Sequence, residues 1–193
     1  TEDINRPVTS DDKWFRPVDI KVGPDRAIYV ADFYERYPSH REHYDGMVWP
    51  DNGRIYRLRA KDAPPVKKLK LVGEGADPVA ALEDKNKTIR QLALRVINDR
   101  RYALTADPLL HDLGKIDPTG DSLEKLWARF LADIHLNADQ LAEYLRHDNP
   151  HVRAWTVRLL CDRGRFPQAV AAHLSELAKS DSNVEVRAQL AAS

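Results

Sequence analysis

The stretch VRAWTVRLL, residues 152–160, decides how most of this chain folds, because it is one copy of an internal repeat. The stretch IRQLALRVI, residues 89–97, aligns with it without a gap, 63 positions earlier. Both place apolar residues at the spacing of an amphipathic helix. The matching apolar pairs are Leu82 and Leu145, Ile89 and Val152, Val96 and Leu159, and Ile97 and Leu160. Each copy therefore predicts a helix ending in leucine, a polar turn and a second helix.

A third copy begins near residue 177, and the chain ends at residue 193 inside its second helix. Between the first two copies, residues 123–134 carry one broad apolar stripe, which predicts a helix packed on its neighbours. Helix pairs that stack side by side bury such stripes, as in an α-solenoid. We expect Trp127 in this stripe and Trp155 in the second copy to pack in the core, and the alternative for Trp155 is an exposed docking group.

The first part of the chain has the pattern of β-structure instead. We expect strands at 18–22, 27–32 and 54–59, the first two joined by a turn at residues 23–26. Arg26 stands where such a turn favours glycine, because the position requires a positive φ. So small a sheet must bury one face against something else. We therefore predict that the chain is a fragment, with a β-domain at 1–64, a linker or edge strand at 65–76, and truncated helical repeats at 77–193.

Composition limits the possible functions. Lys and Arg number 30 and Asp and Glu number 30, so the formal net charge is zero and no basic excess favours nucleic acid as a partner. No apolar stretch is long enough to span a membrane. Cys161 is the single cysteine, which excludes an internal disulfide and the Cys-x-x-Cys-His attachment of c-type haem. We expect its thiol to be a buried structural group.

Three β-stretches and two helical stretches carry a resemblance to a known family. They are WFRPVDIKVGPD at 14–25, IYVADFY at 28–34, NGRIYRL at 52–58, VRAWTVRLL at 152–160 and VRAQLA at 186–191. Together they resemble the membrane-bound dehydrogenase family, whose propeller is similar to those of glucose/sorbosone dehydrogenases. Members continue from the propeller into HEAT repeats and then into a C-terminal c-type haem domain. Arg26, the missing blades and the missing haem motif depart from this pattern.

The resemblance implies an α+β fold class, with an incomplete antiparallel β-propeller blade followed by an α-solenoid of HEAT-like repeats. It implies a scaffold segment that links the propeller to a C-terminal haem domain and contacts the rest of its own polypeptide, with a possible protein partner on the repeat surface. The parent would be a quinoprotein-type sugar dehydrogenase in the cell envelope, in the periplasm, with c-type haem and, less firmly, a quinone or calcium as cofactors. We expect no cofactor within this chain and no activity of the fragment alone.

Recurring charged residues fit the repeat pattern. Arg90, Arg153 and Arg187 each follow the apolar opening of a second helix, and Asp99 and Asp162 recur near the ends of two of these helices. In HEAT repeats such Arg and Asp residues commonly form a ladder between neighbouring units. The alternative is a charged stripe that binds a partner.

The segment 33–50 is the alternative site, because catalytic residues often lie on loops at strand ends. Asp32, Tyr34, His40, Arg41 and His43 could supply a general base or a substrate-binding cation in a sugar- or alcohol-type oxidoreductase. His40 and His43 could also reach one metal, which would still need further ligands. The competing interpretation is that these side chains only pack the loop against neighbouring structure.

Overall fold

The computed structural model describes residues 9–36, 44–46, 49–63, 69–101, 113–114, 122–164 and 166–193. The chain divides into two compact units, residues 1–69 and residues 70–193. This division falls inside the segment 65–76 that the sequence analysis assigns to a linker or edge strand. The residues described between 69 and 76 form turns and bends and no strand.

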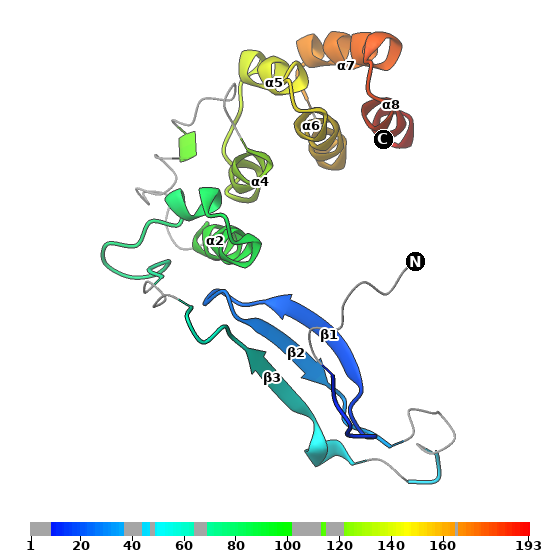
Figure 1. Ribbon diagram of the computed structural model, residues 1–193. Helices are drawn as coiled ribbons and strands as arrows, with labels where there is room; N and C mark the ends of the chain where they lie inside the picture. The colour runs from blue at the N-terminus through cyan, green and yellow to red at the C-terminus, as the bar shows by residue number, and fades with distance from the viewer. Residues whose placement is uncertain are drawn as a thin grey trace. The chain divides into compact units, whose positions relative to one another are not determined.

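The first unit contains a small antiparallel sheet of three strands in the order β1-β2-β3 (Figure 1). The strands are β1 (Pro17–Val22), β2 (Ile28–Asp32) and β3 (Arg54–Leu58), and a short 3-10 turn, η1 (Pro50–Asn52), precedes β3. Val30 of the central strand lies opposite Ile20 on one side and Tyr56 on the other. The three strands predicted from alternation are therefore confirmed.

The turn between β1 and β2 has the predicted conformation. Arg26 has a φ of 62°, which is the left-handed region that favours glycine. Asp25 stabilises the turn, because its carboxylate accepts hydrogen bonds from the Ala27 amide and the Tyr29 hydroxyl, each at 3.1 Å. The same carboxylate pairs with Arg57 of β3, so it connects the turn to the far edge strand.

The predicted fold class is wrong. A propeller blade is a four-stranded sheet that stacks beside other blades. The described residues form one three-stranded sheet, no blade is shown, and most of the secondary structure is helical. The strand pattern and the first hairpin could be read from alternation, but alternation says nothing about how a sheet assembles with other sheets.

Six α-helices and one 3-10 helix are described in the second unit. They are η2 (Ala80–Glu83), α2 (Lys87–Arg100), α4 (Leu123–Leu131), α5 (Ala138–Leu145), α6 (Pro150–Arg163), α7 (Gln168–Ser180) and α8 (Val184–Ala192). Asparagine side chains cap three of the helices in the same way, since Asn86, Asn149 and Asn183 each accept a hydrogen bond from the amide two residues later. This shared cap fixes where the second helix of each pair begins.

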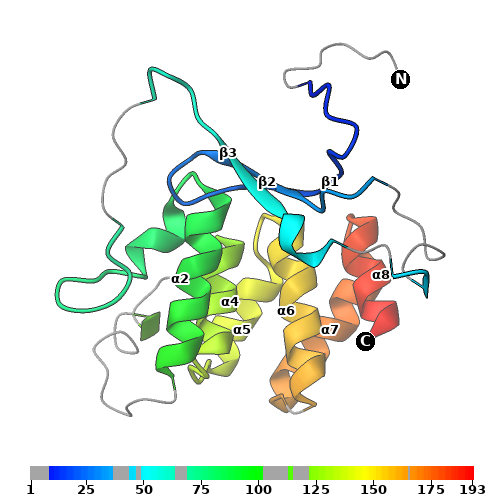
Figure 2. The same ribbon diagram turned by 90° about the horizontal axis from the view of Figure 1, so that it is seen from below.

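The helices lie in two rows (Figure 2). Contacts run from α2 to α4, from α4 to α6 and from α6 to α8, and a second row contains α5 and α7. Helix α4 is thus a member of the first row, between α2 and α6. The offset of 63 residues between the two sequence copies therefore leads from α2 past α4 to α6, which is two steps along this row. Comparing the sequence with itself did not reveal that α4 is the helix between them.

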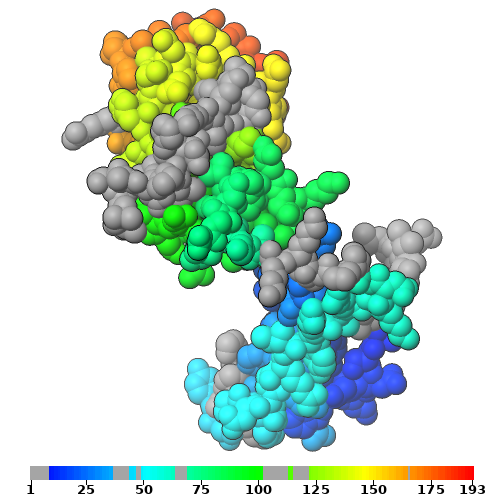
Figure 3. Space-filling view, turned by 90° about the vertical axis from the view of Figure 1, so that its left-hand side faces the viewer, coloured from blue at the N-terminus to red at the C-terminus, as the bar shows by residue number. Residues whose placement is uncertain are grey.

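Two apolar clusters hold the second unit together. Leu82 is fully buried in one cluster with Ala93 and Ile97, whereas Leu145 is fully buried in the other with Val152 and residues of α4 to α7. Ile134 packs against both clusters and joins them. In Figure 3, η2 and α2 (green) and the helices from α5 onward (yellow-green to orange) each appear as closely packed atoms on the side turned to the viewer. The predicted burial of Leu82 and Leu145 is confirmed, although they do not share one cluster.

Candidate functional site

The predicted catalytic segment is described only in part. His40, Arg41 and His43 lie outside the described residues, so the structure says nothing of the imidazole pair or of a metal there. Asp32 and Tyr34 are described, at the end of β2 and just after it.

Asp32 has a structural contact of its own. Its side chain is buried, and Oδ1 accepts hydrogen bonds from the amides of Arg16, at 2.7 Å, and Tyr34, at 3.0 Å. Because one carboxylate oxygen accepts both amides, it holds the residue that precedes β1 close to the residues that follow β2. Asp32 therefore holds the backbone of this loop, whatever else it does.

Tyr34 lies in an aromatic cluster. The Arg54 guanidinium lies 3.7 Å from its ring centroid, and the Trp14 ring is 5.7 Å away. The Asp12 carboxylate, which hydrogen-bonds the phenol, raises the pKa of Tyr34, and partial burial adds to the effect. A phenol with a raised pKa keeps its proton, so this residue is poorly suited to act as a base.

The three recurring arginines of the second unit share one contact. In each, Nη1 donates to the carbonyl of the residue six positions earlier, which lies at the start of the turn before the helix. For Arg90 this carbonyl belongs to Asp84, for Arg153 to His147, and for Arg187 to Asp181. The arginine thus ties each second helix to the turn before it, and its remaining nitrogens face outward from that turn.

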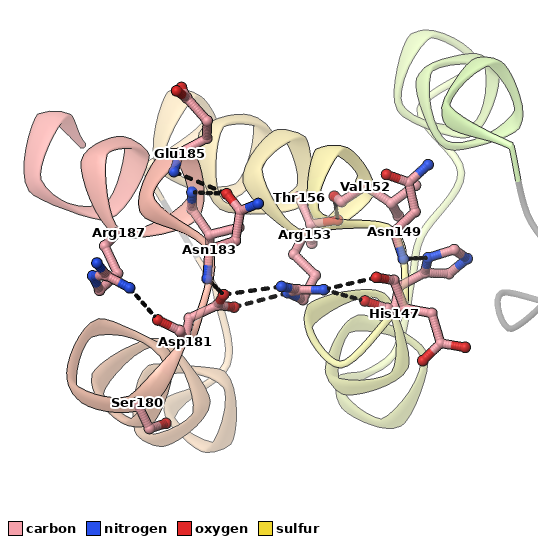
Figure 4. A network of polar contacts seen from close by, with 12 residues as sticks. His147, Asn149, Val152, Arg153, Thr156, Ser180, Asp181, Asn183, Glu185 and Arg187 are labelled. Carbon is pink, nitrogen blue, oxygen red and sulfur yellow. Dashed lines mark hydrogen bonds and ion pairs between the residues drawn. The ribbon is translucent and has the colours of Figure 1, made fainter.

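Arg153 uses those remaining nitrogens to reach the next helix pair (Figure 4). Its Nε lies 2.8 Å from Oδ2 of Asp181 and its Nη2 lies 2.9 Å from Oδ1. The Asp181 carboxylate is nearly fully buried, and it also accepts a hydrogen bond from the Asn183 amide. The bond from Arg153 lowers the pKa of Asp181, although desolvation opposes the shift.

Arg90 reaches a different carboxylate. Its Nε donates to Oε1 of Glu124 on α4 at 2.5 Å, so α2 and α4 are joined by a contact of the same kind. Asp99 and Asp162 do not take part in these contacts. They pair within their own helices with Arg95 and Arg158, each at 3.8 Å and largely exposed. Such exposed pairs contribute little to stability.

Sequence reasoning missed Asp181 and Glu124 as the acidic partners. A usable signal was present, because Asp84 and Asp181 both stand six residues before a recurring arginine and two before a capping asparagine. His147 takes this position in the intervening pair, where its Nδ1 accepts the Asn149 amide at 2.9 Å. An acidic residue is therefore absent from this position in the middle copy, and this made the recurrence of Asp84 and Asp181 harder to recognise in the sequence.

An apolar groove lies across α2, α4 and α6 and has a volume of about 410 Å³. We call it the tryptophan groove, and it is lined by Leu94, Trp127, Phe130, Leu131, Trp155, Leu159, Asp162 and Arg163. The rings of Trp127 and Trp155 meet edge to face with their centroids 4.9 Å apart. The two tryptophans therefore form one continuous apolar wall from neighbouring helices.

Polar groups border this wall. The Arg158 guanidinium lies 5.0 Å from the Trp155 ring centroid, and the Arg163 guanidinium lies 4.5 Å from the Phe130 ring centroid. The Nε1 atom of Trp127 is buried and has no hydrogen-bond partner among the described residues.

Two other hollows have a different character. One, of about 450 Å³ between α5 and α7, is polar and is lined by Arg146, His173, Glu176 and the Arg153–Asp181 pair. Another, of about 570 Å³ in the first unit, lies along the sheet beside Val18, Ala31 and Ile55. In the first, Arg153 and Asp181 already pair with one another, whereas the buried Nε2 of His147, which also lines it, has no hydrogen-bond partner among the described residues.

The groove is suited to binding rather than to chemical catalysis. Its only titratable lining residues are Asp162 and Arg163, and Asp162 already pairs with Arg158. Within the described residues, no group of three or more His, Cys, Asp or Glu side chains could hold a metal ion. Half-buried aromatic and aliphatic side chains bordered by arginine are typical of protein–protein contacts.

A protein-family model matches the first part of the chain. Residues 4–63, within the first unit, match a domain of unknown function, DUF7133. No curated protein and no solved structure matches the chain. Among the helices that the structure describes, none has both the length and the apolar character that crossing a bilayer requires.

Proposed function

We propose that the second unit is a protein-interaction scaffold and that a partner protein docks in the tryptophan groove. The observation that carries the proposal is the paired Trp127 and Trp155, which line an apolar groove of about 410 Å³ across three helices. Tryptophan and arginine are the residues most enriched among those that dominate binding energy at protein interfaces.

The groove also indicates what the partner segment contains. A bulky apolar side chain of the partner fills the space between Trp127, Trp155 and Leu159. Arg158, stacked over Trp155, is largely exposed and can receive an acidic side chain at the edge. The partner is therefore a segment with an apolar anchor and a neighbouring acidic side chain.

A photo-crosslinking amino acid at Leu159 tests this arrangement, with the same amino acid at the exposed Ala172 of α7 as the control. We expect a partner that is captured in cells at position 159 and not at position 172. The captured protein, once purified, should bind the wild-type chain and should bind Trp155→Ala at least about tenfold more weakly. Equal capture at both positions, or equal affinity for the two chains, would remove the proposal.

The position of this scaffold in a multidomain dehydrogenase of the cell envelope stays a prediction from family resemblance. The contacts of the rest of the polypeptide, the haem domain and the quinone or calcium cofactor belong to the same prediction. Oxidoreductase chemistry in the first unit belongs to the same prediction; among its candidate residues, Asp32 holds two backbone amides through Oδ1, and the phenol of Tyr34 keeps its proton.

A further inference from the structure

The turns that precede α2, α6 and α8 are built alike except at one position. Each begins with a residue whose side chain accepts the backbone amide of the capping asparagine two positions later. In two turns the acceptor is an aspartate oxygen, at 2.7 and 2.9 Å, and the pairs are Asp84 with Asn86 and Asp181 with Asn183. In the turn before α6, Nδ1 of His147 accepts the Asn149 amide at 2.9 Å (Figure 4). An imidazole thus takes the place of a carboxylate in this turn.

This hydrogen bond requires a neutral imidazole. A ring nitrogen accepts an amide N–H only if it carries no proton itself, so the ring proton of His147 lies on Nε2. That Nε2 atom is buried and has no hydrogen-bond partner in the part of the chain that the structure describes. The closed turn therefore contains one tautomer of the neutral ring, with Nδ1 as the acceptor.

A second proton on the ring would disrupt the turn. On Nδ1 it would face the Asn149 amide, donor against donor, and the imidazolium N–H at Nε2 would find no acceptor among the described residues. The carbonyl of His147 accepts Nη1 of Arg153 at 2.7 Å, so the new charge would also lie close to a guanidinium. A carboxylate ordinarily ionises at about pH 4, so an aspartate in the same position remains an acceptor well above that pH.

Charged groups from the neighbouring elements lie around this turn. The polar hollow of about 450 Å³ that His147 lines is also lined by six titratable or charged residues: Arg146, Asp148, Arg153, His173, Glu176 and Asp181. The Asp181 carboxylate is already bound by Arg153 through two hydrogen bonds. Asp148 and Glu176 are exposed, so water and salt screen their attraction for a charge on the ring. These acids therefore offset little of the lost acceptor.

Two other imidazoles lie near the same turn. His173 on α7 approaches Arg146, whose Nη2 lies 3.2 and 3.4 Å from its two ring nitrogens. His151 is exposed in the first turn of α6, where a positive charge opposes the helix dipole. Both rings titrate in the range of an ordinary imidazole, so an experiment has to separate them from His147.

We propose that His147 makes the turn before α6 a pH-sensitive switch, closed while the imidazole is neutral and opened by a second proton. The closed turn binds one proton fewer than the open turn, so its stability is full at about pH 7.5 and falls as the pH decreases through about 6.5, where an exposed imidazole titrates. The carbonyls of His147 and Asp148 hold Arg153, so opening loosens the contact of Arg153 with the next helix pair. The switch is independent of the tryptophan groove.

Amide hydrogen exchange of the full chain, followed by NMR at pH 7.5 and pH 5.5, tests the proposal. After correction for the intrinsic exchange rate, we expect the protection of the Asn149 amide to fall about tenfold at the lower pH, the limit for one proton taken up near pH 6.5. The amides of Asn86 and Asn183 are internal controls, because aspartates accept them, and their protection should change less than about twofold. An equal fall at all three amides would overturn the proposal.

Three variants assign the effect to one ring. His147→Asp supplies the acceptor of the other two turns, so the Asn149 amide should stay protected at both pH values. His151→Gln and His173→Gln remove the other two imidazoles and should keep the full fall. The proposal fails if the fall persists in His147→Asp or disappears in either of the other variants.

The imidazole nitrogen chemical shifts of the wild type give a second measurement that needs no variant. At pH 7.5 we expect Nδ1 of His147 to be unprotonated and Nε2 to carry the proton. A ring that carries its proton on Nδ1 at this pH cannot accept the Asn149 amide, and this result would also overturn the proposal.

Discussion

Arg153 and Asp181 join two successive helix pairs through two hydrogen bonds of 2.8 and 2.9 Å, although 28 residues separate them in the chain. The guanidinium holds its own preceding turn by Nη1 and the following turn by Nε and Nη2 (Figure 4). One side chain thus fixes the spacing of three backbone segments.

Breaking this junction should destabilise the second unit strongly. Arg153→Ala leaves the nearly fully buried Asp181 carboxylate without its cation, and we expect a loss of about 3–5 kcal/mol. Arg158→Ala is the matched control in the same helix, since its pair with Asp162 is long and exposed, and we expect less than about 0.5 kcal/mol. Urea unfolding of both variants measures the difference. Equal losses would show that the junction is not a principal contact.

The same junction predicts a dependence on pH. Arg153 lowers the pKa of Asp181 in the folded chain, so the ionised carboxylate contributes stability above its unfolded pKa of about 3.9. That contribution is lost as the pH falls through the lowered folded pKa. We therefore expect the stability advantage of the wild type over Asp181→Asn to be full above about pH 4 and to shrink at lower pH. An advantage that grew toward low pH would contradict the assigned direction of the shift.

The backbone conformation of Arg26 predicts that a glycine at this position would stabilise the first unit. Its φ of 62° costs an L-residue energy that glycine avoids, so Arg26→Gly should raise the free energy of unfolding by about 0.5–1 kcal/mol. Gly23→Ala in the same turn is the opposite case, because an added Cβ would collide with the Tyr29 ring and the Asp25 carboxylate. Thermal melts compare the two. A loss of stability in Arg26→Gly would mean that its side chain outweighs the backbone strain.

Substitutions at Asp32 test whether this residue has a structural role or a catalytic one. Asp32→Ala removes the acceptor of two amides in a buried position and should cost about 1–3 kcal/mol. Asp32→Asn keeps an oxygen in place, so we expect a smaller loss. Denaturation of the two variants tests the order. If Asp32→Ala melted like the wild type, the residue would not hold the loop, and its candidacy for catalysis would become stronger.

Particular residues show how far sequence carried the interpretation. Alternation located the strands and the strained position of Arg26, and helical periodicity located the buried Leu82 and Leu145. These features are local, and local propensity determines them. The repeat appeared at an offset of 63 residues because α4, the helix between the two copies, lacks the recurring arginine. Arg153 lies four residues after the Asn149 cap of α6, whereas the residue four positions after the Ser122 cap of α4 is Leu126.

The rest depended on the packing of distant residues. Arg90 pairs with Glu124 in the first turn of α4, whereas Arg153 pairs with Asp181 in the turn before a helix. The two acidic partners therefore lie at different positions of their helix pairs, and no fixed spacing could identify Glu124 as the partner of Arg90. The tryptophan groove arises because Trp127 and Trp155 come from separate helices, and each alone has the pattern of a core residue. The propeller expectation rested on resemblance in the strands, which cannot specify how many strands a sheet has or what covers it.

The affinity of the captured partner for two matched arginine variants tests the proposed scaffold most directly. Arg158 and Arg95 hold equivalent positions in α6 and α2 and form similar exposed pairs, but only Arg158 stacks on the groove. Isothermal titration should show that Arg158→Glu weakens binding by about tenfold or more, whereas Arg95→Glu leaves it unchanged. Equal affinities for the two variants would contradict a binding site at the tryptophan groove.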